Sequence, residues 1–218
     1  MTTLRRLKDV VALQQFGMVL KKAEAHAEIA EALQKIGYSP EILAQGTEFL
    51  RIARIKYSEN VEKKDRYSFV QADLVKKKQE VERIYREHRQ IARLICINDP
   101  GLEQKMAING GYPKKYPLWL ESVRKFYVLA NRKTDIRKKL LGMGLSSDEF
   151  LKGMTDLTQL EILLANKKRL FGDLRLSTAE KNQAFKDLHK WMRIFFAAAR
   201  LALKDKPELL QALERHLG

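Results

Sequence analysis

The amino-acid sequence predicts an all-α protein built as a tandem duplication of one helical bundle. Sliding the chain 107 positions along itself, without a gap, gives 16 identities in the 90 pairs between residues 13–102 and 120–209. Apolar residues recur at helical spacing in both copies, and no segment alternates with period two over the length of a strand. The 11 glycines and 5 prolines lie mostly between apolar stretches, as expected of helices joined by short turns.

Most of the identical pairs are turn residues or apolar residues, the two classes that set where helices end and which face they bury. They include Leu13 with Leu120, Ala23 with Ala130, Ile29 with Ile136, Leu33 with Leu140, Gly37 with Gly144, Ser39 with Ser146, Gly46 with Gly153, Leu50 with Leu157, Ala92 with Ala199, and Pro100 with Pro207.

Each copy is predicted to form three long helices and one short helix. We expect helices over residues 6–36, 40–65, 70–97 and 100–108, then over 116–143, 147–171, 178–204 and 207–216. Gly37 can adopt the positive φ that ends a helix, Ser39 can cap the next helix, and Pro40 suits its first position. Gly144 and Ser146 repeat this pattern in the second copy.

The later boundaries in each copy depend on other local patterns. Ser177–Glu180 has the spacing of a capping box, and Ser68 with Gln71 is its nearest equivalent in the first copy. Each short helix follows a proline, Pro100 or Pro207. The turn-rich segment 109–117 is expected to link two domains, residues 1–108 and 118–218.

The helix expected over 116–143 is apolar on two sides of its circumference. Trp119, Val123 and Phe126 lie along one side, whereas Leu129 and Ile136 lie along another. A helix of this kind has to be covered from more than one direction. We therefore expect the two bundles to pack against each other with approximate two-fold symmetry.

Charge and cysteine content limit the compartment and the class of partner. The net charge is +15, with 20 basic and 15 acidic residues in 1–107 and 22 basic and 12 acidic residues in 108–218. Such an excess accompanies either affinity for polyanions or a soluble basic surface. Cys96 is the single cysteine, which excludes an internal disulfide. With no signal-peptide pattern and no long apolar run, the expectation is a cytoplasmic protein without membrane contact.

The sequence predicts no catalytic residue, no metal site and no cofactor. None of His26, His88, His189 and His216 has a glutamate three positions before it, the spacing that dimetal helical bundles require. His88 stands where the second copy has Phe195, which favours a packed core residue. Cys96 is expected in the last turn of a helix, where the helix dipole opposes thiolate formation. Enzymatic activity is therefore not predicted.

One basic surface is predicted, in the second copy. Lys125, Arg132 and Lys139 are spaced by seven and would share one face of a helix over 116–143. Four further basic residues lie close in sequence, namely Lys114, Lys115, Arg124 and Lys138. Tyr112 and Tyr116 alternate with the linker lysines and would offer rings for stacking on single strands.

Three functions fit these observations. The first is a non-enzymatic interaction or scaffold protein, with a protein partner or a second copy of the chain. The second is binding of nucleic acid or another polyanion through the basic second half. The third is a small-molecule pocket where the halves meet, with Trp119, Tyr127, Trp191 and His88 as lining residues.

Overall fold

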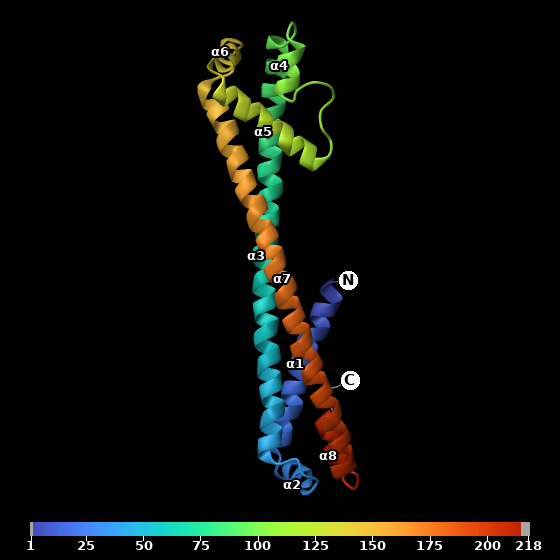
Figure 1. The fold of residues 1–218 in the computed structure, drawn as a ribbon. Coiled ribbons are helices and arrows are strands. Elements are labelled where there is room, and N and C mark those ends of the chain that lie inside the picture. The colour runs from blue at the N-terminus through green and yellow to red at the C-terminus, as the bar shows by residue number, and fades with distance from the viewer. Residues whose placement is uncertain (1, 215–218) are drawn as a thin grey trace. The chain divides into compact units, whose positions relative to one another are not determined.

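The computed structural model describes residues 2–214, and the side chains of residues 8–214. Within that range every regular element is a helix and no strand is present. The prediction of an all-α fold is confirmed. The helices are α1 (Thr2–Ala25), α2 (Ala27–Lys35), α3 (Pro40–Ile95), α4 (Pro100–Lys105), α5 (Tyr116–Arg132), α6 (Thr134–Gly142), α7 (Ser147–Ala202) and α8 (Pro207–Glu214) (Figure 1). No helix in the described range is long and apolar enough to cross a membrane.

Most helix ends agree between the two halves under the same shift of 107 positions. Both ends of α2 match those of α6, and both ends of α3 match those of α7. The two turn glycines also match, since Gly37 has a φ of 92° and Gly144 a φ of 96°. Both positions need the left-handed conformation that glycine adopts without steric cost.

The expectation of three long helices in each half is wrong. Residues 40–65 and 70–97 were expected as separate helices, but α3 runs unbroken through Tyr67 and Phe69, and α7 likewise runs through the capping-box pattern at Ser177–Glu180. The polar side chains there are satisfied without a helix end, because Thr178 donates to the carbonyl of Leu174 (2.7 Å). Residues 215 and 216 of the last expected helix lie outside the described range.

The first long helix expected in each half is interrupted, and no interruption was predicted there. His26 (φ −92°, ψ 106°) separates α1 from α2, and Lys133 (φ −108°, ψ 100°) separates α5 from α6. The extended residue changes the direction of the chain, so that Ile29 of α2 and Ile136 of α6 are buried. The two apolar sides noted for 116–143 thus belong partly to two different helices.

The chain forms two compact units that each combine segments of both halves. Unit 1 comprises Met1–Asp65 and Gly172–Gly218, and unit 2 comprises Arg66–Phe171. The segment 109–117, expected as a linker between domains 1–108 and 118–218, lies inside unit 2 between α4 and α5. The compact units therefore differ from the expected domains, because α3 and α7 each contribute one part to each unit.

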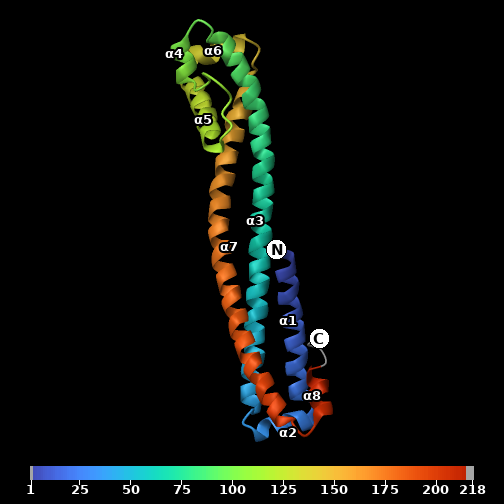
Figure 2. The same cartoon turned by 90° about the vertical axis from the view of Figure 1, so that its right-hand side faces the viewer.

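In unit 1, α1, α2 and α8 lie beside the first part of α3 and the last part of α7 (Figure 2). In unit 2, α4, α5 and α6 lie beside the last part of α3 and the first part of α7 (Figure 1). Each unit has its own apolar core, and the buried positions of one core recur in the other at the same shift. Matching buried pairs are Phe16 and Val123, Leu20 and Tyr127, Ile29 and Ile136, Leu43 and Phe150, Val81 and Leu188, Tyr85 and Met192, and Met106 and Leu213.

Candidate polyanion interface

A basic surface without ion pairs to acidic residues of the described part of the chain lies where α5 meets α6 in unit 2. We call this surface the α5–α6 corner and define it by Arg132, Lys133, Arg137, Lys138 and Lys139. Lys133 holds the extended conformation that ends α5 and precedes α6. The turn thus separates Arg132, at the end of α5, from three cations on α6.

Electrostatic pairing within the protein leaves these five cations free. Four of them are exposed, and the fifth, Arg137, lies half-buried with its guanidinium 5.3 Å from the centre of the Phe150 ring. None of the five forms an ion pair with any acidic residue in the described part of the chain. Residues 132–142 hold five basic residues and one acidic residue, Asp135.

Unit 1 provides a matched comparison, because α1 and α2 form the same helix–break–helix arrangement. The counterparts of the five cations, 107 positions earlier, are Ala25, His26, Ala30, Glu31 and Ala32. Residues 25–35 hold one basic and two acidic residues, a net charge of −1 against +4 for residues 132–142. In unit 1, Glu28 is also neutralised, by Lys206 at 2.8 Å. The accumulation of cations is therefore specific to unit 2.

The structure brings together only part of the predicted basic surface. Lys125, Arg132 and Lys139 were expected in one row, but the break at Lys133 places Lys139 on α6 and the other two on α5. The prediction that these three residues form a row on one helix is therefore wrong. Arg132, Lys138 and Lys139 do belong to the corner.

Acidic neighbours neutralise the two predicted cations in the middle of α5. Arg124 forms ion pairs with Glu161 (2.7 Å) and with Glu121 (3.0 Å), and Lys125 lies 3.7 Å from Glu121. The Glu161 and Glu121 carboxylates raise the pKa of Arg124, which keeps it charged and paired. These two residues are less available to a ligand than the corner.

Lys114 and Lys115 lie at the other end of α5, about 25 Å from the corner at the helical rise per residue. Lys114 lines a cavity of about 430 Å³ whose other lining residues come from α3, from the loop before α5 and from α5 itself. They are Lys78, Glu82, Arg86, Tyr112, Pro113, Tyr116 and Trp119.

The rings that were expected to stack on nucleotide bases are occupied within the protein. Arg86 lies 4.7 Å from the centre of the Tyr112 ring, and Lys78 lies over Tyr116 (6.0 Å) and Trp119 (5.5 Å). The Trp119 indole also donates a hydrogen bond to Tyr112 (2.7 Å). The loop is held further by arginine donors on α3, since Arg89 donates to the carbonyl of Ile108 at 2.8 Å. These contacts give Tyr112 and Tyr116 a structural role.

The groups considered for catalysis are buried in the core of unit 2. Burial lowers the pKa of His88, and a hydrogen bond of 2.9 Å joins its Nδ1 to the Tyr127 hydroxyl. Burial raises the pKa of the Cys96 thiol, with further contributions from Glu103 and Asp99. No cluster of three or more His, Cys, Asp or Glu suited to a metal occurs among the described residues, which leave out His216.

Sequence reasoning missed Lys133 and Arg137, because it started from a row with a spacing of seven and added only some of the basic residues close to that row in sequence. The density of charge over 132–139 is the signal that identifies them. Comparison of the chain with protein-family models, with curated proteins and with solved structures finds no match.

Proposed function

We propose that this protein binds nucleic acid through phosphate contacts at the α5–α6 corner. One observation supports the proposal above the others. Within the described part of the chain the five cations of the corner have no acidic partners, whereas the same arrangement in unit 1 has a net charge of −1. Rows of lysine and arginine bind a phosphate backbone by releasing its condensed counterions. Contacts to phosphates carry no base specificity. Stacking of bases on Tyr112 and Tyr116 is not part of the proposal, because cations of the protein lie over both rings.

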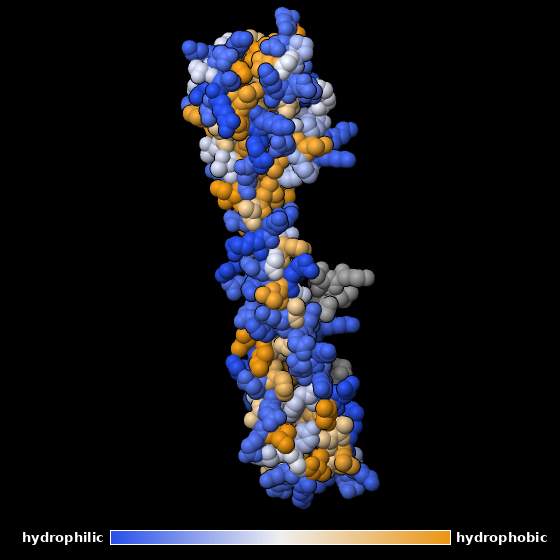
Figure 3. All heavy atoms as spheres, in the orientation of Figure 1, coloured by the Kyte–Doolittle hydropathy of each residue, from blue (hydrophilic) through white to orange (hydrophobic). Residues whose placement is uncertain are grey.

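The electrostatics of the corner favour a polyanionic ligand over a role in folding. An ion pair within the protein would offset the mutual repulsion of the cations, as Glu121 and Glu161 do for Arg124. At the corner Asp135 forms no such ion pair in the described part of the chain, and an external phosphate backbone would supply the missing charge. Hydrophilic side chains cover most of the visible face, with apolar side chains reaching it in separate patches (Figure 3).

The test compares two triple variants by their binding to a fluorescent single-stranded oligonucleotide over a range of salt concentrations. Replacing Arg132, Lys138 and Lys139 with glutamine should reduce the slope of log K against log salt by about 2 to 3, because each lost phosphate contact removes roughly 0.7 to 0.9. The control replaces the exposed lysines Lys21, Lys35 and Lys190 of unit 1 with glutamine. Equal losses in both variants would assign the attraction to total charge and contradict the proposal.

A protein-interaction function has one specific observation in its favour. Tyr67 and Phe171 pair at 5.8 Å between ring centres and line an apolar cleft of about 530 Å³ with Leu164. Phe171 remains 49% exposed. If a protein surface covers this cleft, Phe171→Ser should weaken that association, and sedimentation velocity would measure the change for self-association.

We further propose that the chain arose by duplication of one half. The gapless identities, the matching helix ends and the matching core positions support this origin. Two-fold related units are the arrangement that such a history favours, and small-angle scattering of the intact protein compared with symmetric and asymmetric arrangements would test it.

A further inference from the structure

The two halves of the chain differ at buried positions in a way that makes them specific for each other. Each unit pairs a segment of one half with a segment of the other half, so every core contains contacts between halves. We infer that these contacts select pairing of unlike halves and reject pairing of like halves from two copies of the chain. Four pairs of positions, related by the shift of 107, carry the inference.

The first pair is a buried hydrogen bond in unit 2 that has an apolar counterpart in unit 1. His88 and Tyr127 are 2% and 1% exposed, and their side chains are hydrogen-bonded at 2.9 Å. The counterparts in unit 1 are Phe195 and Leu20, both within the apolar core. Two N-terminal halves would place His88 against Leu20, and two C-terminal halves would place Tyr127 against Phe195. Either combination leaves a buried polar group without a partner, which is costly.

The second pair concerns the space above two matched glycines. In unit 1 a Cβ at Gly46 would overlap the ring of Trp191, whereas in unit 2 a Cβ at Gly153 would overlap the ring of Tyr127. The same space is thus filled by a residue of the other half in unit 1 and by a residue of the same half in unit 2. The smaller residues at the alternative positions are Leu20 and Ile84.

Combining like halves would disturb this packing in opposite directions. Two N-terminal halves would bring only Leu20 and Ile84 to the glycine and leave a void. Two C-terminal halves would bring both Tyr127 and Trp191 into one space and overfill it. Voids and overpacking both destabilise a core.

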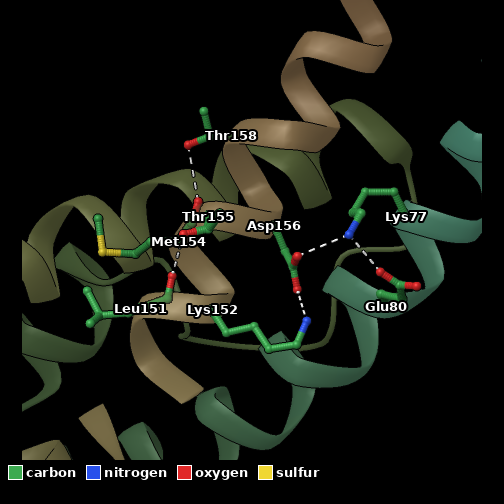
Figure 4. A network of polar contacts seen from close by, with 8 residues as sticks. All are labelled: Lys77, Glu80, Leu151, Lys152, Met154, Thr155, Asp156 and Thr158. Carbon is green, nitrogen blue, oxygen red and sulfur yellow. Dashed lines mark hydrogen bonds and ion pairs between the residues drawn. The ribbon is translucent and has the colours of Figure 1, made fainter. Parts of the chain in front are cut away.

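The third pair is the ion-pair network between α3 and α7 in unit 2 (Figure 4). The Asp156 side chain is 6% exposed, and its carboxylate lies between the ammonium groups of Lys77 (3.0 Å) and Lys152 (2.7 Å). Lys77 also forms an ion pair with Glu80 (2.8 Å). The unit 1 counterparts of Lys77 and Asp156 are Ala184 and Phe49, both in or against the apolar core.

The fourth pair is an ion pair in unit 1 between Asp9 of α1 and the buried Lys181 of α7. Its unit 2 counterparts are Tyr116 and Leu74, which belong to the apolar core there. Pairing of like halves would set Asp9 against leucine and Lys181 against tyrosine. Each charged residue would then lack its partner, and a buried charge without a partner is costly. Because one unit has an ion pair where the other has apolar residues, association of like halves is disfavoured.

The test in the intact chain transplants the packing of unit 1 into unit 2. Ile84→Trp alone should lower the thermal midpoint by about 5 °C, because the new ring meets Tyr127 above Gly153. Adding Tyr127→Leu and His88→Phe recreates the Trp191, Leu20 and Phe195 set and should recover most of that loss. Each of these two substitutions made alone should lower the midpoint. The inference would be overturned if the fall in the thermal midpoint of the triple variant equalled the sum of the falls in the three single variants. Such additivity is the behaviour of sites that do not interact.

A second measurement follows pairing directly. A protease site is inserted between the exposed residues Lys114 and Lys115 of the full chain, which is cut after folding, unfolded in urea and refolded. Native mass spectrometry should then find the mixed dimer of N-terminal and C-terminal fragments and no like-half dimer. Random pairing, with the two like-half dimers together as abundant as the mixed dimer, would overturn the inference, and so would fragments that re-form no dimer.

Discussion

Grafting the basic corner of unit 2 onto unit 1 should create a second polyanion interface. The graft replaces Ala25 with arginine, His26 with lysine and Glu31 with lysine, the counterparts of Arg132, Lys133 and Lys138. His26 and Lys133 share an extended backbone, and Ala25 and Glu31 are exposed, so the fold should accept the new side chains. The substitutions change the net charge of residues 25–35 from −1 to +3.

The expected magnitude follows from the number of cations added. Three new phosphate contacts steepen the dependence of log K on log salt by about 2 to 3, so a threefold reduction in salt tightens binding by an extra factor of roughly 10 to 20. The graft is made in the variant with glutamine at Arg132, Lys138 and Lys139, which should bind weakly, so the new surface is measured alone.

Fluorescence anisotropy of a labelled single-stranded oligonucleotide, titrated at several salt concentrations, measures this change. The control adds the same total charge at three dispersed exposed positions, through Ser58→Lys, Ala179→Arg and Asp205→Lys. The reasoning is refuted if the control and the graft restore binding equally, because then total charge, and not the arrangement at a helix break, determines affinity.

Three further outcomes are expected, all measured by thermal or urea unfolding. Gly37→Val and Gly144→Val should each destabilise by about 1 to 2 kcal/mol, because no atom lies near a Cβ at either site and the cost is that of a positive φ; unchanged midpoints would contradict this. Ala107→Gly should stabilise the protein, since Ala107 has a φ of 55° with a side chain that disfavours it. Burial lowers the pKa of His88, so the unfolded chain takes up that proton first and stability falls as pH drops below about 6.5; His88→Phe should flatten this loss.

The helix ends could be predicted because their signals are local. Gly37, Ser39 and Pro40 lie within four residues, and the structure ends and begins helices there. The continuity of α3 and α7 was not predictable from such signals. A serine or threonine with the spacing of a cap also fits inside a helix when its hydroxyl finds a carbonyl one turn back, as Thr178 does with Leu174.

The composition of the units could not be predicted from periodicity, because the two halves present nearly the same apolar faces. An apolar helix face can then pack against a helix of its own half or against the matching helix of the other half. The apolar pattern alone does not decide which of the two it contacts. The deciding contacts, such as Lys77 with Asp156, join residues 79 positions apart. The candidate basic site was named only in part for a related reason. Arg132 and Lys139 were chosen by a spacing that assumes a continuous helix, and Lys138 by its closeness in sequence. The break at Lys133 brings in two cations, Lys133 and Arg137, that this reasoning omits.

The difference between the two corners lies outside the fully buried positions. On α2 and α6 the buried residues are identical, Ile29 with Ile136 and Leu33 with Leu140. The exposed positions between them differ by five units of charge over 11 residues. The core does not require that difference in charge, since α2 of unit 1 buries the same isoleucine and leucine without the cations of α6. In the described part of the chain no carboxylate forms an ion pair with these cations, and the proposed contact with a phosphate backbone would supply the missing negative charge. Comparison of the graft with its charge-matched control tests that proposal.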